Sequence, residues 1–163
     1  CSARWAAHRA EHRAVQAAPR SYVVIPFEVQ SADASLRWLR DASASLLTLD
    51  LGEWTDLTVV EYERTLDLLR EARLDGDRRL GLEDARRVGR RAHAATVVMG
   101  EVTGTPDSLL VVARLYDVAS GQKLEQAQRS AARSADPRPL FAALARDLLD
   151  VAGVAVDGAG GGA

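Results

Sequence analysis

An unbroken apolar run near the start of the chain places the strongest constraint on its fold. Residues 22–27 read Tyr-Val-Val-Ile-Pro-Phe, with β-branched residues at the centre of the run. A run of this length and composition is typical of a buried β-strand, and we expect Pro26 to end it. The chain must therefore build a sheet around residues 22–27, and the remaining elements must cover that sheet.

The rest of the sequence alternates between strand and helix patterns. Further strands are expected at 57–60, 96–102, 109–116 and 123–129, with turns at 75–77, 104–107 and 119–122. Four helices are expected from apolar residues at helical spacing, in the groups Leu36, Leu39, Leu46 and Leu47; Tyr62, Leu66, Leu69 and Ala72; Leu82, Ala85, Val88 and Ala92; and Leu140, Phe141, Leu144, Leu148 and Val151. Ser31 and Asp33 are expected to cap the first of these helices. This order of strands and helices predicts an α/β fold in the broad sense (α+β), a mixed sheet with helices packed on it.

Composition agrees with one soluble globular domain. The chain has 163 residues, a net charge of −2 and 47% hydrophobic residues, and a domain of this size buries roughly 70% of its unfolded surface without help from a metal or disulfide. The single cysteine, Cys1, excludes an internal disulfide. The near-neutral charge and the aromatic content of 5% argue against nucleic-acid binding.

The two ends differ in composition from the body. Residues 1–20 hold four arginines against one glutamate, a local charge of +3, and their apolar spacing predicts a basic helical tether that ends before Pro19. Residues 155–163 are a Gly-rich linker, which implies that something is attached. The folded domain is therefore expected over residues 21–154.

Cys1 followed by Ser2 is how a mature bacterial lipoprotein begins, which makes Cys1 a candidate lipidation site and predicts a membrane tether at or before it. Two alternatives stay open. Cys1 is equally compatible with a truncation point, and a membrane helix that ended at Cys1 would leave the arginine-rich segment on the cytoplasmic face of the inner membrane.

The motifs of the body, taken in order, resemble the amino-terminal domain of the translocation protein TolB. They resemble even more the related modules found with bacterial adenylate cyclases, receptor-type Ser/Thr kinases and tetratricopeptide proteins. The resemblance rests on Val-Ile-Pro-Phe at 24–27 with Ser31 and Asp33 just after, on Leu-Thr-Val-Val at 57–60, on Ala85, Gly89 and Ala92 before the strand at 96–100, and on the stretch 107–121. Val29 stands where the family usually has Asn, and Glu125 where it often has Trp.

The resemblance implies a five-stranded mixed sheet, a location in the bacterial periplasm or cell envelope, and a role in protein contacts or sensing. The expected function is a non-catalytic envelope module, monomeric in isolation, that binds a protein partner or a small signal. The chain could also be the sensory part of a receptor-type kinase or cyclase whose catalytic domain lies elsewhere.

One enzyme alternative comes from the residues themselves. His8, Glu11 and His12 fit the H-x-x-E-H pattern of inverted zinc peptidases, in which two His hold zinc and the Glu acts as base. Catalytic zinc needs a third ligand and a dry cleft, and the only further His is His93. Phosphate-binding Gly-rich motifs are absent from the sequence. The main hypothesis therefore assigns no catalytic, metal-binding or cofactor-binding residue.

Two surface elements are candidate partner contacts. The polar strand after the 119–122 turn is expected to be an exposed edge that could accept a partner strand, through Gln122, Leu124, Gln126 and Gln128. The alternative is an edge protected by its charged residues Lys123, Glu125 and Arg129. Arg86 and Arg90, in the densest basic run of the body, could dock an acidic partner, or they could belong to an ordinary solvated helix face.

Overall fold

The computed structural model describes residues 20–54 and 56–151. Its strands are β1 (Ser21–Val24), β2 (Glu28–Gln30), β3 (Thr58–Val59), β4 (Thr96–Gly104), β5 (Ser108–Asp117) and β6 (Lys123–Ala132). Its helices are the 3-10 turn η1 (Ala34–Leu36), α2 (Leu39–Gly52), α3 (Tyr62–Glu71), α4 (Leu82–Arg91) and α5 (Arg138–Val151). The expected tether (1–20), apart from Arg20, and the expected linker (155–163) lie outside the described residues.

The strands form one mixed sheet in the order β3-β1-β4-β5-β6, with β2 also paired to β4. β1 runs parallel to both β3 and β4, whereas β4, β5 and β6 form an antiparallel meander. All four residues of β1 are buried. The sheet therefore confirms the predicted α+β class and the buried strand that the apolar run indicates.

The expected single first strand is divided in two, so the described part of the sheet has six strands rather than five. β1 pairs with Thr96–Val98 of β4, and β2 pairs with 101–103 of the same strand. Pro26 has no N–H to donate, and the N–H of Phe27 donates to the Arg40 carbonyl of α2 at 3.0 Å instead. The chain leaves the sheet at Pro26, as predicted, and returns to it one residue after Phe27.

Gly100 of β4 makes room for this detour. A Cβ at Gly100 would lie 2.3 Å from the Phe27 ring, so the ring packs directly on the glycine backbone. Phe27 is fully buried and also contacts Phe141 of α5 edge to face, with ring centroids 6.3 Å apart. The break between β1 and β2 thus places the Phe27 ring between the Gly100 backbone and Phe141.

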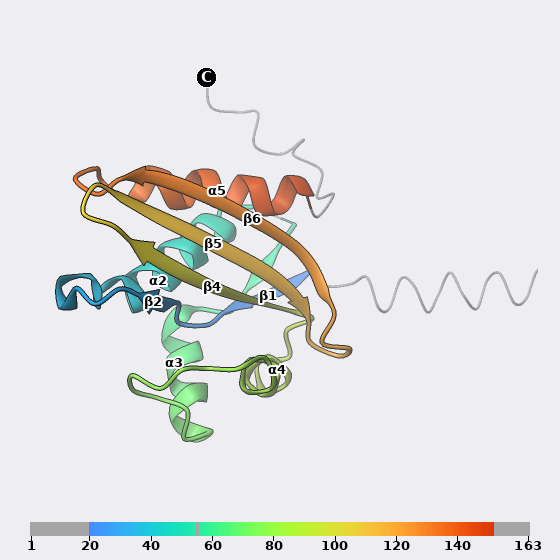
Figure 1. Cartoon of the computed structure of the whole chain (residues 1–163). Helices are drawn as coiled ribbons and strands as arrows, with labels where there is room; N and C mark the ends of the chain where they lie inside the picture. The colour runs from blue at the N-terminus through green and yellow to red at the C-terminus, as the bar shows by residue number, and fades with distance from the viewer. Residues whose placement is uncertain (1–19, 55, 152–163) are drawn as a thin grey trace, which may run out of the picture.

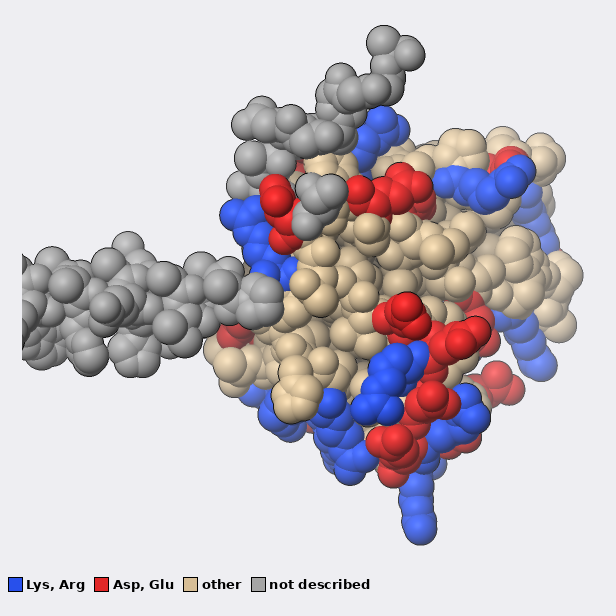
Figure 2. All heavy atoms as spheres, turned by 180° about the vertical axis from the view of Figure 1, so that it is seen from behind, with Lys and Arg blue, Asp and Glu red and all other residues tan. Residues whose placement is uncertain are grey.

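Helices cover the two faces of the sheet unequally (Figure 1). α2 and α5 pack on one face, against alternate residues of β1, β4, β5 and β6. α3 and α4 pack on the other face, against β1, the start of β4 and, at its margin, Tyr116 near the end of β5. On the side seen in Figure 2, basic and acidic side chains of the described residues lie next to one another, as on a surface without a strong field of one sign.

Two local expectations differ from the structure. α3 buries Thr65, Leu68 and Leu69, whereas Tyr62, Leu66 and Ala72 of the expected stripe are only partly buried. Tyr62 lies at the margin of the core, where its hydroxyl donates to Asp41 of α2 at 2.5 Å. Asp33, expected to cap the first long helix, accepts from the Ser35 backbone at 2.9 Å and so caps η1, while α2 begins later, at Leu39.

Candidate functional site

The half of the sheet that lies beyond α3 and α4 has one face with no described helix on it. The register of the strands places eight side chains along this face: Glu101 and Thr103 of β4, Leu110, Val112 and Arg114 of β5, and Gln126, Gln128 and Ser130 of β6. We call these eight residues the open face. Figure 1 looks onto it, with α2 and α5 behind the sheet.

Polar contacts join four strands across the open face. Arg114 Nη2 lies 2.8 Å from Glu101 Oε1, and Arg114 Nε donates to Gln126 Oε1 at 3.2 Å. Gln30 of β2 donates to the other Glu101 oxygen at 2.9 Å, and Lys123 Nζ lies 3.4 Å from Gln126 Oε1. The side chains of this face therefore hold one another in place before anything binds.

The predicted edge strand is present as β6, which lies at the end of the described sheet and extends three residues past the expected end at 129. Gln126 and Gln128 are exposed on the open face, Gln122 is exposed just before the strand, and Leu124 is 46% exposed at a bulge opposite the Leu115–Tyr116 step. The predicted contact residues of this strand are thus accessible together at one margin of the molecule.

The charge of Arg129, expected to protect the edge, points to the covered side of β6 instead. Its guanidinium makes a two-point contact with Asp147 of α5, at 2.6 and 3.0 Å. The hydrogen bond from Arg129 lowers the pKa of the Asp147 carboxyl. Arg129 therefore fastens α5 to β6 and leaves the outer edge without that charge.

Arg86 and Arg90 lie on α4, away from the open face, and their surroundings differ. Arg86 donates to the carbonyls of Val118 and Ala119 at 2.9 and 2.7 Å and pairs with Glu83 at 2.6 Å, and only 17% of its side chain is exposed. Arg86 thus supports the turn before β6, where Gly121 has a positive φ. Arg90 is exposed. We therefore leave Arg86 out of the contact surface proposed below.

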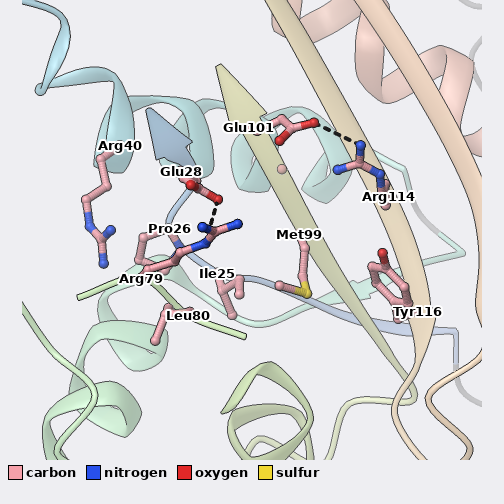
Figure 3. Close-up of a pocket in the computed structure, with 11 residues that line it drawn as sticks. Ile25, Pro26, Glu28, Arg40, Arg79, Leu80, Met99, Glu101, Arg114 and Tyr116 are labelled. Carbon is pink, nitrogen blue, oxygen red and sulfur yellow. Dashed lines mark hydrogen bonds and ion pairs between the residues drawn. The ribbon is translucent and has the colours of Figure 1, made fainter. Parts of the chain in front are cut away.

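A pocket of about 80 Å³ lies where the open face meets the loop before α4 (Figure 3). Apolar and charged side chains line it, from the link between β1 and β2, from β2, α2, the 77–81 loop, β4 and β5: Ile25, Pro26, Glu28, Arg40, Arg79, Leu80, Met99, Gly100, Glu101, Arg114 and Tyr116. No sequence motif marks this site, because its residues come from separate segments of the chain.

A wider groove of about 330 Å³ adjoins the pocket and shares Glu28, Arg40 and Arg79 with it. Arg37, Asp77 and Val29 complete its walls. Arg79 Nε lies 3.4 Å from Glu28 Oε2, and Arg40 Nη2 donates to the Arg78 carbonyl at 3.0 Å. Arg40 therefore ties α2 to the 77–81 loop that forms one side of the pocket.

The residues of the zinc and lipid hypotheses, His8, Glu11, His12 and Cys1, lie outside the described residues. His93 is exposed and follows α4 with a positive φ of 55°, so it ends the helix rather than belonging to its last turn. Over 20–54 and 56–151, no group of three or more His, Cys, Asp or Glu could hold a metal ion. None of the described helices has the length and apolar character needed to span a membrane.

No protein-family model matches the sequence, and no curated protein matches it. Solved structures do match. Lipoprotein GNA1162 from Neisseria meningitidis aligns with a TM-score of 0.59 and 16% identity, over 81% of this chain and 96% of that one. LpoB from E. coli aligns with a TM-score of 0.56 and 14% identity, over 72% of this chain and 60% of that one. At these identities the likeness shows a shared fold.

TolB from Acinetobacter baumannii also aligns, with 16% identity, over 80% of this chain and 27% of that one. Its TM-score of 0.49 is too low to show a shared fold. The resemblance to the TolB amino-terminal family therefore stays a prediction, although the fold class that it implies is present.

Proposed function

We propose that this domain is a non-catalytic module of the bacterial cell envelope that binds a protein partner through the open face and the outer edge of β6. The observation that carries the proposal is the uneven covering of the sheet. Helices bury both faces around β1, but no described helix packs on the open face over β5 and β6.

A partner strand added at β6 would meet backbone groups that it can pair with and side chains that it can pack against. The last strand of a sheet presents unpaired backbone N–H and C=O groups, which supply affinity in strand addition. Leu110 and Leu124, 37% and 46% exposed, supply apolar contact area beside that edge. The glutamines between them can hydrogen-bond a partner without the desolvation cost of a charge.

The chemistry of the open face favours binding over catalysis. Glu101 is its only carboxylate, and both oxygens of that group already accept hydrogen bonds, from Arg114 and Gln30. Glu101 is thereby engaged in holding Arg114 and Gln30 in position. The groups of this face are therefore arranged to recognise a surface.

The envelope location is supported by the shared fold with lipoprotein GNA1162. In the proposed arrangement a lipid on Cys1 tethers the domain to a membrane, and the open face remains available to the partner. The same contact surface would serve if the domain were the sensory part of a longer receptor-type protein.

Site-specific photo-crosslinking in the full-length protein, produced in its own host, tests this proposal. A crosslinking amino acid at Gln128 is expected to capture one defined protein. The matched control is Leu49, which is 65% exposed on α2 and belongs to the opposite side of the sheet. Replacing both Gln126 and Ser130 with Lys should reduce the Gln128 crosslink at least fivefold. Equal capture from Gln128 and Leu49 would contradict the proposed surface.

A further inference from the structure

We propose that the pocket and the adjoining groove bind a small monocarboxylate with a short apolar chain, the chain inside the pocket and the carboxylate among the arginines of the groove. The site shares Glu101 and Arg114 with the open face, but none of its residues belongs to the outer edge of β6 or is changed in the crosslinking test at Gln126, Gln128 and Ser130. A failure of partner binding at β6 and a failure of carboxylate binding here are therefore separate results.

The inner part of the site suits a short hydrocarbon group. Ile25, Leu80 and Met99 supply apolar walls, and Tyr116 closes the side toward β5 (Figure 3). A volume of about 80 Å³ is comparable to that of about three water molecules, at ~30 Å³ each. That volume is of the order of three or four carbon atoms, so we expect a chain of about that length.

The charges around the site call for an anion. Among the described residues, neither Arg37 nor Arg40 has a carboxylate within ion-pair distance. Arg40 is only partly exposed, and its bond to the Arg78 carbonyl holds it beside the pocket. Guanidinium groups bind carboxylates through paired hydrogen bonds, and they do so best when they are already held in position.

The charge balance selects a single negative charge. The groove holds three arginines, Arg37, Arg40 and Arg79, against Glu28 and Asp77, which leaves one positive charge uncompensated. In the pocket, the further pair of Glu101 and Arg114 is internally neutral. One carboxylate would complete the balance, whereas a doubly charged phosphate would leave an excess negative charge beside Glu28 and Asp77.

Titration of the full chain with small probes, followed by ¹H–¹⁵N NMR, tests the inference. Butyrate is expected to shift the amide signals of Met99, Gly100 and Arg40. It should bind about 15-fold more tightly than acetate, because each buried methylene contributes about fourfold, or ~0.8 kcal/mol. Butylammonium and inorganic phosphate should bind at least tenfold more weakly than butyrate. Equal affinities for butyrate and butylammonium, or for butyrate and acetate, would overturn it.

Variants separate the two halves of the site. Arg37→Gln should weaken butyrate binding at least fivefold, while Arg87→Gln, an exposed arginine on α4, should leave it unchanged. Met99→Phe and Leu80→Phe fill the pocket in two different ways, and each should remove the preference for butyrate over acetate while acetate still binds. An unchanged butyrate affinity in Arg37→Gln, or an unchanged chain-length preference in both filling variants, counts against the site.

Discussion

Strands β1 and β6 belong to one sheet but have opposite surroundings. β1 has four residues, all buried, with strands on both sides and helices over both faces. β6 has ten residues, of which only Ala127 is buried, with a strand on one side and α5 over one face. β1 therefore belongs to the buried centre of the sheet, whereas nine of the ten residues of β6 are partly or fully exposed.

The sharpest test of the comparison places the same charge in both strands. Val24→Asp would bury an unpaired carboxylate among α2, α5 and β4, and we expect it to cost at least about 4 kcal/mol and to unfold the domain. Gln128→Asp, on the exposed side of β6, should change stability by less than about 0.5 kcal/mol. Urea unfolding followed by circular dichroism measures both, and similar losses would contradict the difference in burial.

Gly100→Ala tests the break between β1 and β2. The new Cβ would lie 2.3 Å from the Phe27 ring, so the ring must move, and we expect a loss of about 1–3 kcal/mol in unfolding free energy. Gly52→Ala at the end of α2 meets no atom within 4 Å and serves as control, with no loss expected. A Gly100→Ala protein as stable as the wild type would mean that the ring does not pack on this backbone in solution.

Arg129→Gln tests whether the ion pair between Arg129 and Asp147 holds α5 on β6. The Arg129–Asp147 contact is partly exposed, with 48% and 29% of the side chains accessible, so its loss should cost no more than about 1 kcal/mol. A double-mutant cycle with Asp147→Asn isolates the pair. A coupling energy of zero would show that apolar packing alone fastens α5 to β6.

A further prediction concerns a pH dependence of stability at the end of α2. Burial and the neighbouring Glu53 raise the pKa of Asp50 to about 6, above its ordinary value of 3.8. The folded state therefore holds the Asp50 proton more tightly than the unfolded chain, and this residue's contribution to stability is lost as the pH rises from about 4 to 6. Asp50→Asn should remove that loss, which urea unfolding at pH 4 and pH 7 would detect. An unaltered pH profile would contradict the shifted pKa.

Much of the fold could be predicted because the patterns are local. The apolar run at 22–27 and the alternating meander indicated the buried strand and the antiparallel sheet, and each is present. The polar strand expected at 123–129 is present as β6, at the edge of the described sheet. The α3 stripe was partly wrong, because spacing alone does not say which side of a helix meets its neighbours, and Thr65 and Leu68 proved to be on that side.

Less of the candidate site than of the fold could be predicted from the sequence. Gln126 and Gln128 could be identified from their polarity in a strand, but Arg86 was indistinguishable from Arg90 by sequence, although its guanidinium binds the Val118 and Ala119 carbonyls 32 and 33 residues away. The arginines of the groove come from the end of η1, from α2 and from the 77–81 loop, and no spacing rule connects the loop with the other two segments. Only the Arg37-x-x-Arg40 spacing offered a faint signal.

By itself the sequence determined the order of the elements, the burial of the first strand and the polarity of the last one, because hydrophobic periodicity acts over a few residues. Tertiary structure decided the division of the first strand, since Phe27 must meet Gly100 from 73 positions away. It also decided the open face and the pocket, because which faces the helices cover depends on how distant segments pack. Such packing depends on the arrangement of the whole chain, and no short stretch of sequence specifies it.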